Sequence, residues 1–160
     1  MAELGTQKRL ALVNLEDLFP RLRGTAYKIT SPAQPDYNCI AWAAGDHSRW
    51  WEPDSLGQYY WPEEVSRRYT VEAYAKAFQK LGFEVCQDAA FEVEVEKVAI
   101  FAGQDGSPTH AARQLEDGTW TSKLGQLEDI KHLELDHVGE YGNPVLFLKR
   151  PRIEPTSLLK

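Results

Sequence analysis

From Phe83 onward the sequence has strand-like patterning, and this half of the chain restricts the possible folds more than any other feature. Apolar and polar side chains alternate there or form short apolar runs, as in strands with one or two covered faces. Asp105-Gly106 and Asp117-Gly118 are turn signals between such runs. The pattern predicts an antiparallel sheet, with strands at residues 83–86, 91–95, 97–101, 109–115, 119–123 and 145–148.

The first half of the chain has helical spacing instead. Helix caps are expected at Asn14, Asn38 and Thr70, and helix ends at Pro20, Gly45 and Gly82. Residues 24–37, which contain two prolines, read as a loop. Helices followed by an antiparallel sheet indicate an α+β fold, and the 160 residues fit a single domain.

The composition restricts the partners and the compartment. The 18 basic and 24 acidic residues give a net charge of −6, which argues against binding to nucleic-acid phosphates. No apolar stretch reaches the roughly 18 residues that a membrane-spanning helix needs, and residues 1–9 lack the apolar segment of a signal peptide. We therefore expect a cytoplasmic protein that binds neither nucleic acid nor membrane, with export as an effector by a signal-less route as the alternative.

The two cysteines do not form a disulfide framework, and no Cys/His spacing is typical of a zinc site. Cys86 lies in an alternating strand and is interpreted as a core residue. A disulfide between Cys86 and Cys39 would require an oxidising compartment. We expect no metal and no organic cofactor, and a zinc site formed by Cys39, His110 and His132 is the weaker alternative.

Cys39 and His110 are the residues for which the sequence indicates chemistry. If Asn38 caps a helix, Cys39 lies in its first turn, where free N–H groups and the helix dipole favour a thiolate. His110 opens a predicted strand, and the small Ala111 and Ala112 behind it would let that strand approach the helix closely. A nucleophilic cysteine needs a base within hydrogen-bond reach. One hypothesis is a thiolate–imidazolium pair, and the other is that Cys39 is an ordinary buried residue.

The motifs around these two residues resemble those of the papain-like cysteine hydrolases. "YNCIAWAAGD" is similar to their nucleophile helix, and "THAARQLEDGTWTSKLG" to the hairpin that carries their histidine. The order, cysteine before histidine, is that of NlpC-type peptidases and CHAP-type amidases. The combination of NCIAW, HAARQL, TSKLG and YG also resembles uncharacterised bacterial proteins, many of them cyanobacterial. The resemblance implies a papain-like α+β fold, with an N-terminal nucleophile helix packed on a C-terminal antiparallel sheet.

A third catalytic residue, which would orient His110, is left open by the sequence. His132 and Ser122 are the candidates. A two-residue turn at Asp117-Gly118 would place the neighbours of Ser122, rather than Ser122 itself, on the side of His110.

Substrate-binding residues are expected near the cysteine and in the aromatic segment 50–61. The candidates are Gln34, which the resemblance implies as an oxyanion donor, and Asn38, Trp42, Trp51 and Trp61. Asn38 is better explained as a helix cap. The aromatic segment has a second interpretation, a long loop held in place by burial of its own rings. His47 could cover the site, and His137 is interpreted as a surface residue.

Two functions of different classes follow from these residues. The first is thiol-dependent acyl transfer at an amide bond of a protein or peptide, as in a peptidase, amidase, deamidase or transglutaminase. The second is a non-catalytic domain that binds a partner protein, with Cys39 in the core and the aromatic segment as the contact surface. The oligomeric state is left open.

Overall fold

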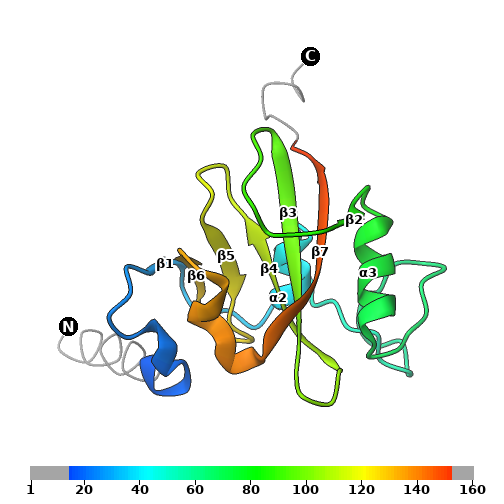
Figure 1. The fold of residues 1–160 in the computed structure, drawn as a ribbon. Helices are drawn as coiled ribbons and strands as arrows, with labels where there is room; N and C mark the ends of the chain where they lie inside the picture. The colour runs from blue at the N-terminus through cyan, green and yellow to red at the C-terminus, as the bar shows by residue number, and fades with distance from the viewer. Residues whose placement is uncertain (1–14, 153–160) are drawn as a thin grey trace.

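The computed structural model describes residues 15–152, in which short helices flank both sides of a seven-stranded antiparallel sheet (Figure 1). The helical elements are η1 (Pro20–Leu22), α2 (Cys39–Ala43), α3 (Val71–Gln79) and η2 (Leu135–Tyr141). The strands are β1 (Lys28–Ser31), β2 (Glu84–Cys86), β3 (Val95–Ala102), β4 (Pro108–Gln114), β5 (Trp120–Lys123), β6 (Asp129–His132) and β7 (Asn143–Pro151). Their order across the sheet is β1-β6-β5-β4-β3-β7-β2.

The sheet separates two hydrophobic clusters. In Figure 1, α2 lies behind the sheet, against β4 and β5. The longer helix α3 lies at the right-hand edge, beside β7 and β2. Val98 and Ile100 of β3 face these two helices, whereas Ala99 and Phe101 face η1 and η2 on the other side. Because both faces of β3 are covered, its sequence is a continuous apolar run rather than an alternation.

The predicted papain-like α+β fold is wrong. Antiparallel sheet dominates the described chain, and α2 and α3 are only 5 and 9 residues long. The sheet is not C-terminal to the cysteine helix either, because β1 precedes α2 in the chain and pairs with β6 to form one edge of the sheet. The sequence did not show β1 because three of its four residues are exposed, so that no apolar alternation marks the strand.

Most of the predicted strands are confirmed within a few residues. They correspond to β2, β3, β4, β5 and β7. Residues 91–94 are not a strand, since Glu94 has a left-handed φ of 63° directly before β3 begins. β6 was not predicted, because its four residues include a buried Asp129 and a buried His132 that interrupt any apolar pattern.

Two predicted helix caps are confirmed. The Asn38 side chain accepts a hydrogen bond from the Ala41 N–H at 3.2 Å, and Thr70 Oγ1 accepts one from the Ala73 N–H at 3.1 Å. These bonds satisfy backbone donors that a helix start otherwise leaves free. Asn14 lies outside the described residues, and the helical residues 15–18 end before Pro20, as expected.

The turn between β4 and β5 is one residue longer than expected. Leu115 N–H donates to the Thr119 carbonyl at 2.7 Å across residues 116–118, and Gly118 has a left-handed φ of 87°. The register pairs Arg113 with Thr121. Because successive side chains of a strand face opposite sides of a sheet, this register places Ser122 on the face of His110. The expected two-residue turn is therefore wrong. The register shifts by one residue, so Ser122, and not its neighbours, lies on the side of His110.

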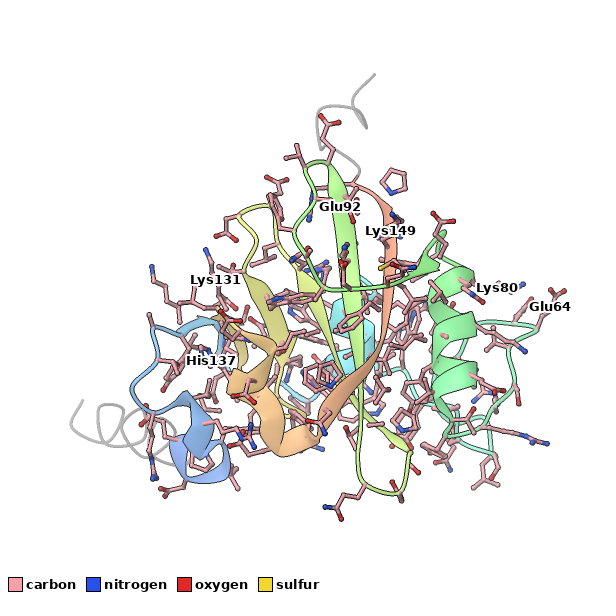
Figure 2. All side chains as sticks on the ribbon, in the orientation of Figure 1. Glu64, Lys80, Glu92, Lys131, His137 and Lys149 are labelled. Atoms are coloured by element: carbon pink, nitrogen blue, oxygen red, sulfur yellow. The ribbon has the colours of Figure 1, made fainter. Side chains whose placement is uncertain are left out.

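Charged residues cover the outer surfaces in pairs. In Figure 2, Lys80, the C-cap of α3, lies beside Glu64, and Lys149 of β7 lies near Glu92, with N–O distances of 3.0 and 3.8 Å. Arg150, in the basic strand end, pairs with Glu96 at 3.0 Å. Exposed pairs of this kind contribute little, about 0–1 kcal/mol each. Within residues 15–152, no helix combines the length and the apolar character that crossing a membrane requires.

Candidate active site

Three buried polar side chains form a hydrogen-bonded chain on the η2 side of the sheet. His110 Nε2 lies 2.9 Å from Ser122 Oγ, which lies 2.8 Å from His132 Nε2. His132 Nδ1 lies 2.8 Å from the carbonyl oxygen of Glu134. Strands β4, β5 and β6 each supply one of these side chains, and none is more than 1% exposed. The structure thus joins His110 to both candidates for the third residue.

The carbonyl at the end of this chain determines where each proton lies. A carbonyl only accepts hydrogen bonds, so His132 Nδ1 carries the proton and Nε2 of the neutral ring is an acceptor. Ser122 therefore donates its hydroxyl to His132 and accepts from His110 Nε2–H. His110 Nδ1 is left as a lone pair, and it is buried with no hydrogen-bond partner among the described residues. An unpaired buried acceptor costs about 1–3 kcal/mol, so this nitrogen is poised to accept a proton.

Cys39 lies at the N-terminus of α2, which packs on the opposite face of the sheet from η2. Its side chain packs against the core and stays partly exposed, and its sulfur lies against the backbone of Ala111, the residue after His110. On the side of the sheet that carries His110, the ring of Tyr141 stacks on the His110 ring with centroids 4.1 Å apart and planes 4° from parallel. The sulfur thus lies against the backbone of the residue after His110, and no hydrogen bond joins it to His110 Nδ1.

The thiol and the imidazole are both neutral in this arrangement. Burial raises the pKa of the Cys39 thiol to about 11, while the nearby backbone of Ala111, Ile40 and Cys39 and the charge of Lys123 oppose that rise. Burial also holds the pKa of His110 well below its usual value, and His132 adds to this effect. Both pKa shifts run against the thiolate–imidazolium pair expected from the sequence, because desolvation outweighs the effects of the five-residue helix and of the nearby ammonium.

Tyr141 and Gly142 hold the other side of the His110 ring. The Thr109 hydroxyl donates to the Tyr141 carbonyl. Gly142 has a φ of 119°, and a Cβ atom there would lie 2.1 Å from the Ala102 carbonyl oxygen, so only glycine fits. Tyr141 was not among the predicted site residues, although the YG motif that contains it was noted.

On the other face of the sheet, Lys123 and Asp129 anchor the segment that precedes Cys39. Lys123 Nζ donates to the carbonyls of Gln34 at 2.7 Å and Gly125 at 2.9 Å, and also to that of Leu127. Cross-strand from Lys123, Asp129 accepts hydrogen bonds from Thr30 Oγ1 and, at 2.6 Å, from Tyr37 Oη. Both charged side chains are fully buried, and no sequence pattern predicts the burial of either one. They fix the backbone from residue 30 to residue 37.

The predicted residues Gln34 and Trp42 line one cavity beside α2. This cavity measures about 400 Å³ and is also lined by Ser31, Pro32, Tyr37 and His47. Trp42 Nε1 donates to Thr121 Oγ1 at 2.8 Å, and its ring lies 5.5 Å from that of Tyr37. The Gln34 carbonyl is bound by Lys123. A largely aromatic cavity next to a helix N-terminus suits an extended or aromatic substrate group.

The remaining predicted residues have structural contacts. Besides capping α2, Asn38 donates to the Trp51 carbonyl at 2.6 Å and accepts from its N–H at 3.2 Å. Trp51 and Trp61 are each only 4% exposed and belong to the core cluster. These positions match the interpretation of segment 50–61 as a loop held by burial of its own rings. Cys86 and Cys39 are both free, and Cys86 is half-buried in the edge strand β2.

In the alternative zinc site, His110 and His132 would bind the metal, but here both are hydrogen-bonded to the Ser122 hydroxyl that lies between them. Within the described part of the chain, no group of three or more His, Cys, Asp or Glu side chains is arranged to hold a metal ion.

Comparison with known proteins identifies a family and nothing beyond it. The model of a domain of unknown function (DUF7689) matches residues 28–149, from the first residue of β1 to β7. No curated protein and no solved structure matches the chain. The match covers more than half of the sequence, and the chain therefore belongs to the DUF7689 family.

Proposed function

We propose that this protein catalyses thiol-dependent acyl transfer at an amide bond of a protein or peptide, with Cys39 as nucleophile and His110 as general base. The observation that carries the proposal is the unprotonated, unpartnered Nδ1 of His110, held in that state by Ser122 and His132, in the residue directly before Ala111, whose backbone the Cys39 sulfur lies against.

The reaction starts from a neutral pair. As Cys39 Sγ attacks the carbonyl carbon, the thiol proton moves to His110 Nδ1, a C–S bond forms and the carbonyl π electrons become an oxyanion. Free backbone N–H groups at the start of α2 are available to that oxyanion. When the tetrahedral species collapses, the C–N bond breaks and His110 returns the proton to the leaving amine, giving a thioester. Water or a second amine then attacks the thioester.

Ser122 and His132 are positioning residues in this scheme. They hold the Nε2–H tautomer of His110 in the ground state, and they stabilise the imidazolium through its Nε2–H once Nδ1 is protonated. Lys123 and Asp129 hold the backbone of the segment that leads to Cys39. Two free cysteines fit a reducing compartment, and we place the reaction in the cytoplasm.

A second candidate function, binding of a partner protein without catalysis, is favoured by one observation. The Cys39 thiol has a raised pKa and no hydrogen bond to His110. A thiol in that state is a poor nucleophile unless the base approaches it during the reaction.

The test is the rate at which p-nitrophenyl acetate acylates Cys39, measured from nitrophenolate release and located by mass spectrometry of the digested protein. A His110-assisted thiol is acylated at a rate that is nearly constant from pH 6.5 to 9, because His110 stays unprotonated there. An unassisted thiol with a pKa of about 11 reacts about tenfold faster with each pH unit over the same range.

The variants separate the two functions further. We expect His110→Ala to slow acylation by about 10²-fold or more and to convert the flat profile into the steep one. Cys86→Ser is the matched control and should leave the rate unchanged. If wild type and His110→Ala share one steep profile, the acyl-transfer proposal is wrong and the binding function stands.

A further inference from the structure

Near the C-terminal end of α2, a cavity of about 530 Å³ is lined by charged side chains. They come from β3, β4, the following turn, β6 and the end of β7, and they are Glu96, Arg113, Glu116, Asp117, Lys131 and Arg152. Three are basic and three acidic. Equal numbers of the two signs do not mean that every charge has a partner, because some of these residues form ion pairs and others do not.

Most of these charges are already engaged. Lys131, which Figure 2 labels on β6, lies 2.5 Å from Asp117. Glu96 pairs with Arg150 at 3.0 Å and with Arg152 at 3.7 Å. Arg152 also donates to two backbone carbonyls. The carboxylates of Asp117 and Glu96 thus form their direct ion pairs with Lys131, Arg150 and Arg152.

Arg113 is the exception. Among the described residues, no hydrogen bond or ion pair joins its guanidinium to any other side chain or carbonyl, and its Nε is buried without a partner. Its guanidinium carbon lies 5.4 Å from the centre of the Trp42 ring, and a Cβ atom on Gly45 would lie 3.7 Å from Nη1. The ring and the backbone thus hold the group in place without supplying an acceptor.

The surroundings also penalise this charge. Burial lowers the pKa of Arg113, and Arg152 and Arg150 lower it further by repulsion, against the opposite effect of Glu96. A buried guanidinium is usually matched to a carboxylate or phosphate, because its rigid fork of donors fits their oxygens in pairs. Within residues 15–152, Glu96 and Asp129 favour the charge of Arg113 from a distance, but no carboxylate forms a hydrogen bond or ion pair with it.

We infer that this cavity binds the oxyanion of a small molecule, a carboxylate or a phosphate, through the guanidinium of Arg113 with Arg152 and Lys131 beside it. The site is separate from Cys39 and His110, and it does not depend on acyl transfer. Glu116, which lines the same cavity without an ion pair, opposes the ligand by repulsion.

Inorganic phosphate and acetate are the probes. The midpoint of thermal unfolding is measured as either salt replaces sodium chloride at constant ionic strength, and phosphate binding is followed separately from its ³¹P line width. We expect a saturable rise of the midpoint with phosphate, acetate or both, and which probe saturates identifies the class of oxyanion.

Arg113→Gln should weaken binding about tenfold or more, since it removes the charge and the paired donors. Glu116→Gln should tighten binding about twofold by removing repulsion. Arg23→Gln, at an exposed arginine that pairs with Asp17, is the control and should change nothing. If Arg113→Gln does not fold, Arg152→Gln is the second variant, expected to weaken binding severalfold by ³¹P line width.

A response that is linear in salt and equal in wild type, Arg113→Gln and Arg23→Gln would overturn the inference. So would a saturable response that neither Arg113→Gln nor Arg152→Gln reduces, because the anion would then bind elsewhere.

Discussion

Ser122 and Lys123 are neighbours in β5 but belong to polar networks of opposite character. Ser122 lies in a chain of neutral groups that ends in a free acceptor at His110 Nδ1. Lys123 lies in a network of charged groups. Its ammonium donates to three carbonyls, and the carboxylate of Asp129, across the strands from it, accepts from two hydroxyls. Both side chains are fully buried. A network in which every group has a partner stabilises a fold, whereas one with an unsatisfied end can take part in chemistry.

The largest effect should come from breaking the charged network. Lys123→Met leaves three carbonyls without a donor and removes the positive charge across the strands from the buried Asp129, and we expect a loss of about 3–5 kcal/mol in the free energy of unfolding, measured by urea titration. Lys131→Met is the matched control on the adjacent strand, since its partly exposed ion pair with Asp117 contributes less than about 1 kcal/mol. Equal losses in the two variants would show that Lys123 has no special structural role.

The hydrogen-bonded chain of His110, Ser122 and His132 should show itself in the pH dependence of the free energy of unfolding. Burial lowers the pKa of His132 to about 4, below the ordinary value of 6.5. An unfolded chain therefore binds a proton at His132 before the folded protein does, so stability is complete above pH 6.5 and falls as the pH drops toward 4. The loss of stability from His132 amounts to roughly 3 kcal/mol. The lowered pKa of His110 adds to this loss, because the unfolded chain also binds a proton there first.

Urea titrations at several pH values between 4 and 7 measure this loss. His132→Gln should remove most of the slope that His132 contributes, because glutamine does not titrate. A pH dependence that is identical in wild type and His132→Gln would contradict the neutral, buried state of the chain.

The smallest change in stability, and the sharpest separation of the two networks, should come from one hydroxyl. Ser122→Ala leaves His110 Nε2–H and His132 Nε2 without partners, at a cost of about 1–2 kcal/mol. It also removes the hydrogen bond that holds His110 in its Nε2–H tautomer, so acylation of Cys39 should slow about tenfold.

Thr121→Val is the control for this variant. It removes a hydroxyl that Trp42 binds on the opposite face, and it should cost a similar amount of stability without slowing acylation. If both variants slow acylation equally, the hydroxyl of Ser122 does not act through His110.

Much of the local structure could be read from the sequence. The caps at Asn38 and Thr70 were predictable because short polar side chains bond backbone N–H groups within a few residues. Strands β3, β4 and β5 were predictable because their patterning and turn residues are local. Cys39, His110, Ser122 and His132 were identified as candidates from their residue types and contexts.

Other features depended on contacts between distant segments. β1 and β6 have little apolar patterning of their own and form strands by pairing with each other. The buried Lys123 and Asp129 reach residues 30–37 from the other end of the chain. A pattern of charged residues normally indicates a solvated surface, so local reasoning pointed away from them.

The sequence by itself determined the elements and the chemical groups, because both follow from residues close together in the chain. Tertiary structure alone decided which groups meet and in what protonation state. One extra residue in the turn at 116–118 brings Ser122 to the face of His110, and burial in the folded protein keeps His110 and Cys39 neutral. Strand register and desolvation are properties of the assembled sheet, and no short stretch of sequence contains them.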